Sequence, residues 1–446
     1  MYLTFFFFFF FFFFIFAAVL LLKNIRYNQQ LKGLKSKLKQ QNKKTEEQEK
    51  KISDLEKNIK TKLEKARNVH QRMLPDKLEE PEEFFISDYY QPAEYIGGDY
   101  YNFFKIDHGS MDPFFDQYLL YFFDVSGHGI DSTLLSIFVN DSIENYFKLR
   151  HSPGEMISTK ELMNYIEDRY QKEGFPDDYL VCLFIAVLDQ NQHTLNYSSG
   201  GFQYPVYKLN EKEEVEEINI GGLPISTALG SLKDLRQEKT IDFEKNSSLV
   251  LSTDGLLEQS NGSDIYFEQF EKLISKYKFL PAPFLKDIIR SDFYGFTGDN
   301  QGQDDITYLI LERPEGEIFN YTLKAENKEE VKNELLEFLN QNQWSINQPL
   351  TLFKDIIFSV MTEKSGYLKI KGVNNQNLLM ISFEAEDNDS NWDRLFNEYP
   401  ELISIAEKDL SKNNSDEEEL NLDSEELYYS HNNLNNRIYL LLLKNK

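Results

Sequence analysis

The chain opens with an almost uninterrupted apolar run. Tyr2–Leu22 is nearly all apolar and contains ten consecutive phenylalanines, Phe5–Phe14. About 20 such residues cross a bilayer as a helix. Basic residues follow the run from Lys23 onward and none precedes it, so the positive-inside rule places the rest of the chain in the cytoplasm. We therefore expect residues 1–22 to be an uncleaved single-pass anchor in the inner (cytoplasmic) membrane. A cleaved signal peptide fits less well, because no positive side chain precedes the run and no small-x-small site ends it.

Between about Gln29 and Met73 the apolar positions alternate spacings of three and four residues. This heptad pattern is typical of a coiled coil, although its middle is polar. We expect residues 23–73 to form a coiled-coil helix that pairs with a second copy of the chain, giving a homodimer. A single solvated helix that tethers the next domain is the alternative. The seam positions are Leu31, Leu34, Leu38, Gln41, Thr45, Gln48, Ile52, Leu55, Ile59, Lys62, Ala66, Val69 and Met73.

From Pro81 to Leu311, apolar runs of strand length are mixed with helical patterns. The predicted strands are Phe84–Tyr90, Tyr118–Asp124, Tyr179–Asp189, His193–Ser198, Phe202–Leu209, Ser248–Thr253 and Thr307–Leu311. The predicted helices are Ser132–Leu149, Lys160–Lys172 and Phe267–Tyr277.

The composition changes after Arg313-Pro314-Glu315-Gly316, which predicts a domain boundary there. Residues 315–446 are expected to form a small α/β module. The acidic, asparagine-rich stretch Ser411–Asn436 is expected to be a flexible insertion within it. The predicted helices of the module are Asn327–Asn340 and Leu350–Thr362, and its predicted strands are Gly366–Val373, Asn377–Glu384 and Arg437–Leu443.

The 446 residues include 74 acidic and 48 basic ones, which gives a net charge of −26. This balance argues against a nucleic-acid partner, because phosphate backbones bind basic surfaces. An acidic enzyme that acts on phosphate must invert its local charge, and bound divalent metal ions would do so. The single cysteine, Cys182, lies in an apolar run and is expected to pack in the core.

Four acidic motifs stand out: three adjoin predicted strands, and one places an acid after a pair of glycines. Any one of them could cap a turn. Four carboxylates that meet without a basic partner would need cations, and oxygen ligands suit magnesium or manganese better than zinc. Glycines beside the acids would let the backbone approach a ligand closely. The motifs are Ile96-Gly97-Gly98-Asp99-Tyr100, Asp124-Val125-Ser126-Gly127-His128-Gly129, Ser252-Thr253-Asp254-Gly255 and Asp304-Asp305-Ile306-Thr307.

In this order the motifs resemble the metal-dependent serine/threonine phosphatases of the PPM class, specifically the bacterial branch named for SpoIIE and RsbU. The lead-in Gln71-Arg72-Met73-Leu74-Pro75 belongs to the resemblance, as do Ser198-Ser199-Gly200-Gly201 and Gly222-Leu223-Pro224-Ile225. The resemblance covers roughly Val69 to Arg313. It implies an α/β fold for residues 74–314, a two-sheet antiparallel β-sandwich flanked by helices.

The resemblance also implies a chemistry. Two Mn²⁺ or Mg²⁺ ions roughly 4 Å apart would activate a water for in-line attack on phosphoserine or phosphothreonine. By resemblance, Asp124 bridges the ions, and Asp99 and the Val125 carbonyl bind one of them. Asp254 and Asp304 complete the other site, and Asp304 rather than Asp305 is the expected ligand of its pair. No arginine stands clearly in the place of a phosphate clamp.

The expected partner is a phosphorylated signalling protein, because family substrates are often anti-sigma-factor antagonists. The alternative function is a catalytically inactive membrane scaffold that binds a signalling partner through the coiled coil and the C-terminal module. Intact acids in all four motifs favour the enzyme.

Residues 315–446 faintly resemble the histidine-kinase-like ATPase domain. Glu363 and Asp387-Asn388-Asp389 fall near where its metal and adenine residues would lie, but the asparagine after the glutamate and the glycine-rich lid are absent. A degenerate module that binds no nucleotide is therefore expected.

The histidines give a weaker signal than the acids. The pKa range of His128 would allow a general acid, but its offset differs from that of the catalytic histidine of eukaryotic relatives, so a local hydrogen-bonding role is expected. The other histidines show no ligand spacing and are expected at the surface; they are His70, His108, His151, His193 and His431.

Overall fold

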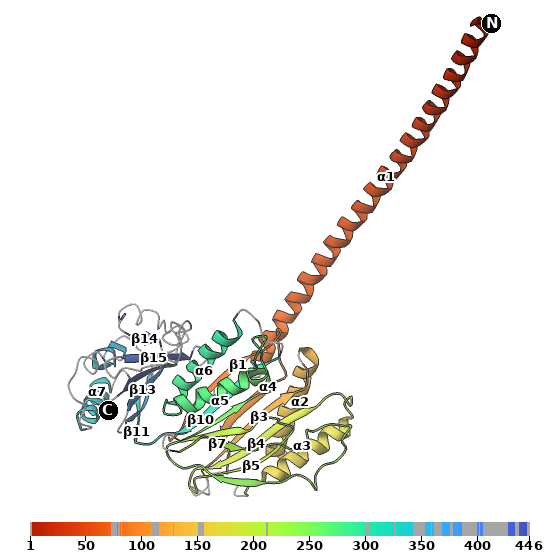
Figure 1. Cartoon of the computed structure of the whole chain (residues 1–446). Coiled ribbons are helices and arrows are strands. Elements are labelled where there is room, and N and C mark those ends of the chain that lie inside the picture. The colour runs from red at the N-terminus through yellow and green to blue at the C-terminus, as the bar shows by residue number, and fades with distance from the viewer. Residues whose placement is uncertain are drawn as a thin grey trace. The chain divides into compact units, whose positions relative to one another are not determined.

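The computed structural model divides the chain into two compact units, Met1–Ala66 and Arg67–Lys446 (Figure 1). It describes residues 2–72, 78, 81, 83–108, 116–127, 129–149, 156–210, 213–298, 304–324, 327–341, 353–357, 359–360, 368–374, 378–385, 399–400, 402–404, 427–432 and 437–443. Each unit is considered by itself.

A single helix, α1 (Tyr2–Gln71), runs through the first unit. Three apolar seam positions of its second half are exposed, namely Ile52, Leu55 and Ile59. Over the part of the chain that is described, no helix combines the length and apolar character needed to cross a membrane. The side chains of residues 2–10 and 12, which make up much of the expected anchor, lie outside the described set.

Two five-stranded antiparallel sheets form the centre of the second unit (Figure 1). The first sheet has the order β2-β3-β4-β5-β8, and the second has the order β1-β10-β9-β6-β7. The strands of the first sheet are β2 (Tyr100–Lys105), β3 (Gln117–Val125), β4 (Val181–Asp189), β5 (Thr194–Gly200) and β8 (Lys239–Asp242). Those of the second are β1 (Phe85–Gln91), β6 (Val206–Asn210), β7 (Glu216–Ile218), β9 (Ser247–Ser252) and β10 (Ile306–Arg313).

The side-chain alternation of β3 explains why the sheets pack face to face. Leu120 and Phe122 lie in a core with Leu249 and Leu309 of the opposite sheet, while Phe123 and its same-face neighbours pack against helices. A strand buried on both faces needs apolar residues at every position, so it reads as an unbroken apolar run. Each fully buried leucine or phenylalanine contributes about 1.5–3 kcal/mol to the sandwich.

Helices cover the outer face of each sheet, which completes the sandwich that the sequence predicts. On the first sheet lie α2 (Ile130–Leu149) and α3 (Thr159–Glu173). On the second lie α5 (Tyr266–Tyr277) and α6 (Ala282–Thr297). The predicted strands and helices of this part agree with the observed ones to within a few residues, except that β6 begins four residues later than predicted, at Val206.

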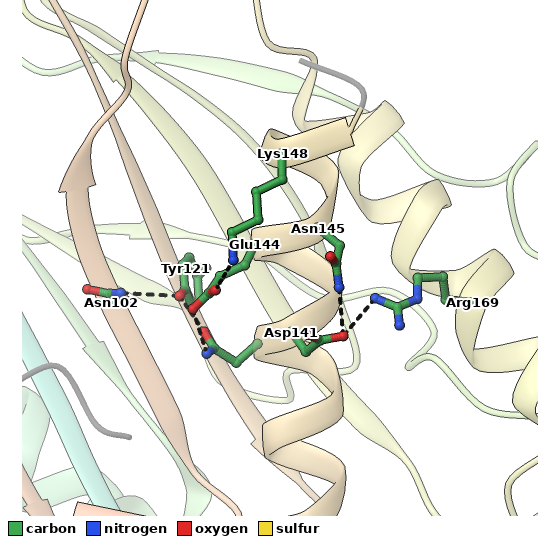
Figure 2. A network of polar contacts seen from close by, with 8 residues as sticks. Asn102, Tyr121, Asp141, Glu144, Asn145, Lys148 and Arg169 are labelled. Atoms are coloured by element: carbon green, nitrogen blue, oxygen red, sulfur yellow. Dashed lines mark hydrogen bonds and ion pairs between the residues drawn. The ribbon is translucent and has the colours of Figure 1, made fainter. Parts of the chain in front are cut away.

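A polar network fixes α2 between β3 and α3 (Figure 2). The Tyr121 hydroxyl of β3 donates to Asn140 Oδ1 over 2.6 Å, and Asn140 Nδ2 donates to Glu144 over 3.4 Å. On the other side of α2, Arg169 of α3 donates to Asp141 over 3.1 Å. Because α2 begins at Ile130, directly after the motif that starts at Asp124, these contacts also hold that motif in place.

A third, six-stranded sheet lies C-terminal to residue 314, in the order β11-β12-β13-β16-β15-β14. One face packs on α7 (Lys328–Gln341) and on helical residues 353–357 and 359–360. The other face shares a core with α6, to which it contributes Met380 and Tyr439. The strands are β11 (Glu317–Leu323), β12 (Leu368–Asn374), β13 (Leu378–Ala385), β14 (Leu402–Ser404), β15 (Leu427–Asn432) and β16 (Arg437–Leu443).

This sheet corrects one expectation. The stretch Ser411–Asn436 is not wholly a flexible insertion, because residues 427–432 form β15, which pairs with β16. The third sheet begins with β11 at Glu317, just after the change of composition, and it shares buried side chains with α6. Lys371 of β12 also donates to the Pro81 carbonyl over 2.8 Å. Glu363 and Asp387-Asn388-Asp389 lie outside the described residues.

Two histidines expected at the surface are buried. His70, at the end of α1, is 4% exposed, and its ring lies 6.4 Å from that of Tyr90. His108, just after β2, is 5% exposed. The expectation was wrong because the absence of metal-ligand spacing says nothing about whether a histidine is buried.

Candidate metal-binding active site

Strand ends bring the acidic motifs together. Asp124 lies at the end of β3, and Asp99 immediately precedes β2, which pairs with β3. In the other sheet, β9 ends just before Asp254, and its antiparallel neighbour β10 begins just after Asp304-Asp305. The ends of β9 and β10 are joined by a hydrogen bond from the Thr253 amide to the Thr307 carbonyl over 2.9 Å. Each sheet therefore supplies two of the motifs to one end of the sandwich.

Hydrogen bonds hold Asp99 in a buried position within this cluster. Its side chain is buried, with the residue 1% exposed. The Thr307 hydroxyl donates to Asp99 Oδ2 over 2.5 Å, and the Thr253 hydroxyl donates to the same oxygen over 3.1 Å. Asp99 also shares a side-chain hydrogen bond with Asp124. Residues from both sheets therefore fix the position of Asp99.

The carboxylate of Asp305 ties down the loop that carries Asp99. Its Oδ1 accepts from the Ala93 amide over 2.8 Å, and its Oδ2 accepts from the Gly98 amide over 2.6 Å. A Cβ at Gly97 would collide with this carboxylate, so only glycine lets the loop lie against it. Both oxygens of Asp305 are thus engaged by the protein backbone.

Close backbone approach at Gly98 places Asp99 beside the end of β3. A Cβ at Gly98 would lie 2.9 Å from the Val125 carbonyl oxygen and 2.8 Å from the Cβ of Ser132. Gly255 is similarly pressed against the backbone of Asp305, which brings Asp254 next to Asp304. The Val125 carbonyl, Asp99, Asp124, Asp254 and Asp304 therefore gather in one place.

Burial and mutual repulsion raise the pKa values of these acids. Burial raises the pKa of Asp124 to about 8, with further contributions from the charges of Asp254 and Asp304. The pKa of Asp254 rises to about 6, again through burial first and then through Asp304. The pKa of Asp99 is raised by burial and by the charge of Asp124. The charges that act most strongly here are all carboxylates.

The donor chemistry fits a hard divalent cation. Within the described residues, no ion pair joins Asp99, Asp124 or Asp254 to a basic side chain, so nothing basic in that part of the chain offsets their repulsion. Among the described residues, no group of three or more His, Cys, Asp or Glu side chains is arranged so that it could already hold a metal ion. The carboxylates stand near one another, and Asp99 is turned toward the two threonine hydroxyls and Asp124.

A family model described as "Stage II sporulation protein E (SpoIIE)" matches residues 116–314. This stretch is a SpoIIE-type domain of the PPM class.

Two curated Bacillus subtilis (strain 168) proteins resemble the chain. Phosphoserine phosphatase RsbU is 25% identical over 258 residues, which is 57% of this chain and 71% of RsbU. Phosphoserine phosphatase RsbP is 21% identical over 256 residues, which is 57% of this chain and 58% of RsbP. Among solved structures, the SiaA-PP2C domain of Pseudomonas aeruginosa aligns with a TM-score of 0.47 and 20% identity, covering 58% of this chain and 98% of that domain.

The acidic cluster includes a residue from outside the matched range. Asp99 precedes residue 116, where the match begins, yet Asp99 lies against Asp124, Thr253 and Thr307 inside it. Residues 73–75 of the lead-in motif lie outside the described residues, and so does His128.

The sequence did not single out three residues of the site. Thr253 and Thr307 belong to the quoted motifs, and their hydroxyl groups beside the acids were an available signal. Tyr90 of β1 had no such signal, but the charges of Asp305 and Asp99 add to burial in raising its pKa, which places its phenol beside the cluster. Cys182, paired with Asp124 across β3 and β4, has a pKa raised by burial and by Asp124, so its thiol is not an activated nucleophile.

Proposed function

We propose that this chain is a membrane-anchored, metal-dependent phosphatase that hydrolyses phosphoserine or phosphothreonine on a partner protein. One observation carries the proposal. Acids from four separate motifs, Asp99, Asp124, Asp254 and Asp304, lie so close together that charges within the group raise the pKa values of Asp99, Asp124 and Asp254. Two curated relatives are named phosphoserine phosphatases, which supports the same activity for the SpoIIE-type domain.

In this proposal each residue has a role. Asp124 would help to hold both metal ions, Asp99 and the Val125 carbonyl would hold one of them, and Asp254 and Asp304 would hold the other. Thr253 and Thr307 orient Asp99 through their hydroxyl groups. Asp305 holds the Ala93 and Gly98 amides and is not a ligand. When bound, two Mn²⁺ or Mg²⁺ ions would lower the pKa of a water and neutralise charge on the phosphoryl group.

The full chain in detergent, assayed with p-nitrophenyl phosphate and Mn²⁺, tests the activity. Asp124→Asn should lower kcat/KM by about 10³-fold, because the loss of metal-derived stabilisation costs several kcal/mol. The matched control is Asp242→Asn, which removes an exposed carboxylate at the end of β8. If both variants turn over like the wild type, the chain is instead a scaffold that binds a signalling partner without catalysis.

Anchoring and pairing complete the proposal. The apolar run Tyr2–Leu22 would hold the chain in the cytoplasmic membrane, with the SpoIIE-type domain in the cytoplasm. The exposed seam of α1, including Ile52, Leu55 and Ile59, fits a second copy of the chain. The full chain should float with vesicles in a density gradient, and residues 23–446 should not. Ile52→Lys combined with Ile59→Lys should shift the detergent-solubilised protein from dimer to monomer in sedimentation.

The partner is proposed from chemistry shared with the relatives. An anti-sigma-factor antagonist that carries a phosphorylated serine is the class of substrate to test first. Capture with the Asp254→Asn variant should enrich phosphorylated proteins over their dephosphorylated forms. Equal recovery of both forms would count against a phosphoprotein substrate.

A further inference from the structure

A further carboxylate, that of Glu258, lies beside the acidic cluster. Helix α4 (Asp254–Leu257) is a single turn, and the amide of Glu258, which follows it, donates to the Asp254 carbonyl over 2.7 Å. The two side chains also act on each other. After burial and the charge of Asp304, the charge of Glu258 is the next contribution that raises the pKa of Asp254. Glu258 belongs to none of the four acidic motifs, although it follows Asp254 by only four residues.

The phenol of Tyr204 holds one oxygen of this carboxylate. The Tyr204 hydroxyl donates to Glu258 Oε1 over 3.1 Å. The Tyr204 ring lies 5.1 Å from that of Phe267 in α5, and this packing restricts where the hydroxyl can point. Burial, then Glu258, and then the charge of Asp254 raise the pKa of Tyr204 to about 12. The phenol therefore keeps its proton at neutral pH and remains a donor to Glu258.

Strand register places this contact at the end of the sandwich that carries the acids. Tyr204 lies in the segment between β5 and β6, which crosses from the first sheet to the second. Tyr207 of β6 pairs with Val250 of β9 in antiparallel register. The residues before β6 therefore lie beside the last residues of β9, just ahead of Asp254.

The second oxygen of the Glu258 carboxylate is not engaged by the protein. In the part of the chain that the structure describes, Glu258 Oε2 accepts no hydrogen bond, and no basic side chain forms an ion pair with Glu258. The residue is exposed, so repulsion from Asp254 would favour a carboxylate that points elsewhere into solvent. The Tyr204 phenol opposes this and keeps the negative charge within reach of Asp254, an arrangement that a bound cation would favour.

We propose that Glu258 is a further carboxylate of the metal site, where it stabilises the ion assigned to Asp254 and Asp304, and that Tyr204 positions it. The inference rests on the proposed function for the place of the ions. Mg²⁺ and Mn²⁺ prefer carboxylate and water oxygens. A carboxylate that reaches such an ion directly, or through a water molecule bound to it, raises the affinity of the site.

Titration calorimetry of Mn²⁺ with the full chain in detergent tests this assignment without turnover. Glu258→Gln keeps an oxygen that can accept from Tyr204 but removes the charge, so it should weaken the binding of one ion about tenfold. Tyr204→Phe leaves the charge but frees the carboxylate to turn away, and should weaken binding by about threefold. Because Tyr204 acts through Glu258, the double variant should bind no more weakly than Glu258→Gln alone. If the two losses simply add, Tyr204 does not act through Glu258.

A further variant tests which ion Glu258 stabilises. In the Asp304→Asn chain, the ion assigned to Asp254 and Asp304 has lost a ligand. In that chain, Glu258→Gln should weaken the remaining Mn²⁺ binding by less than about twofold, because the two changes affect the same ion. Equal losses in the Asp304→Asn chain and in the wild type would overturn the assignment to this ion.

The chain contains a matched control for the contact. The Tyr207 hydroxyl donates to Glu271 Oε1, also over 3.1 Å. Glu271 lies in α5, and its charge is the one that acts most strongly on Tyr207. Glu271→Gln therefore removes a charge from the same kind of contact without altering α4, and it should leave the affinity for Mn²⁺ unchanged. If Glu258→Gln and Glu271→Gln change this affinity alike, Glu258 is not part of the metal site.

Hydrolysis of p-nitrophenyl phosphate separates this assignment from the proposed function. If the wild type binds Mn²⁺ without hydrolysing the substrate, and Glu258→Gln still weakens binding, the catalytic proposal fails and the Glu258 assignment stands. If the wild type hydrolyses the substrate and Glu258→Gln binds Mn²⁺ as tightly as the wild type does, the Glu258 assignment fails alone. A wild-type chain that binds no Mn²⁺ would overturn both.

Discussion

Two groups of buried charges in the two-sheet sandwich are stabilised in opposite ways. At the acidic cluster, Asp99, Asp124 and Asp254 face one another and raise one another's pKa values. At the first sheet's outer edge, Glu167 of α3, with its side chain 1% exposed, pairs with Arg236. The Leu232 amide also donates to Glu167, and Arg236 Nη1 donates to the Leu223 carbonyl. The pair is satisfied by the chain itself, and the cluster is not.

This difference separates a structural charge from a functional one. A buried ion pair with additional hydrogen bonds needs nothing from outside, and its role here is to fasten the loop between Leu223 and Arg236 to α3. Like charges crowded at the end of a sandwich are tolerated only with protons or cations. Clusters of carboxylates that repel one another are therefore better markers of a catalytic centre than buried charges in general.

The largest expected effect comes from breaking the satisfied pair. Glu167→Gln leaves the Arg236 charge buried without its partner, which should lower the free energy of unfolding by about 3–5 kcal/mol. Denaturant unfolding of the full chain measures this. Glu173→Gln, which alters an exposed residue at the end of the same helix, should stay within about 0.5 kcal/mol. Equal effects of the two variants would mean that the ion pair does not hold the loop.

Removing a charge from the acidic cluster should stabilise the metal-free protein, whereas removing the charge of Glu167 should destabilise it. Because the pKa of Asp124 is raised to about 8 and that of Asp254 to about 6, the folded state binds more protons than the unfolded state between about pH 4 and pH 8. The stability of the metal-free protein should therefore fall as pH rises through this window. Asp124→Asn should flatten the fall and stabilise the metal-free protein at pH 8 by at least about 1.4 kcal/mol, the equivalent of one pKa unit.

Thermal unfolding at pH 5, 6, 7 and 8 with EDTA would follow this trend. Adding Mn²⁺ should raise the midpoint of the wild type most at pH 8, because the ions replace the protons that the cluster has lost. A wild-type protein whose metal-free stability rises steadily from pH 5 to pH 8 would contradict the repulsion described for these acids.

The smallest expected effect concerns the threonine that orients Asp99. The Thr307 hydroxyl lowers the pKa of Asp99 through its hydrogen bond. Thr307→Val removes this donor, so the Asp99 carboxylate should hold its proton more strongly and Mn²⁺ should bind about tenfold more weakly at pH 7. Titration calorimetry measures the affinity. Thr307→Ser keeps the hydroxyl and should restore binding, and a Thr307→Ser affinity as weak as that of Thr307→Val would rule out the hydrogen bond as the cause.

Much of the sandwich could be predicted because its strands carry strong local signals. The unbroken apolar run at Tyr118–Phe123 can only be a strand buried on both faces or a buried helix, and its length favours the strand. The short β2 and the exposed β8 were missed because six and four residues carry little periodicity. Helix α6 was missed although Pro281 stands at its N-cap, because its buried residues surround the helix and leave no clear polar face.

Sequence by itself determined the chemical character of the active centre. Four acids, each beside a glycine or at a strand end, appear in an order that resembles one phosphatase class, and this order is written in the chain. Which atoms those acids meet was decided by the tertiary structure. The engagement of Asp305 by the Ala93 and Gly98 amides joins residues more than 200 positions apart, and no local pattern encodes such a contact.

The same reason applies to the buried pair of Glu167 and Arg236. Neither residue belongs to a motif, and Arg236 is one of 48 basic residues in the chain. The two meet only because the loop between Leu223 and Arg236 packs against α3. Local propensities and motifs are properties of neighbouring residues, whereas a site depends on which distant residues are packed together, and only the folded chain decides that.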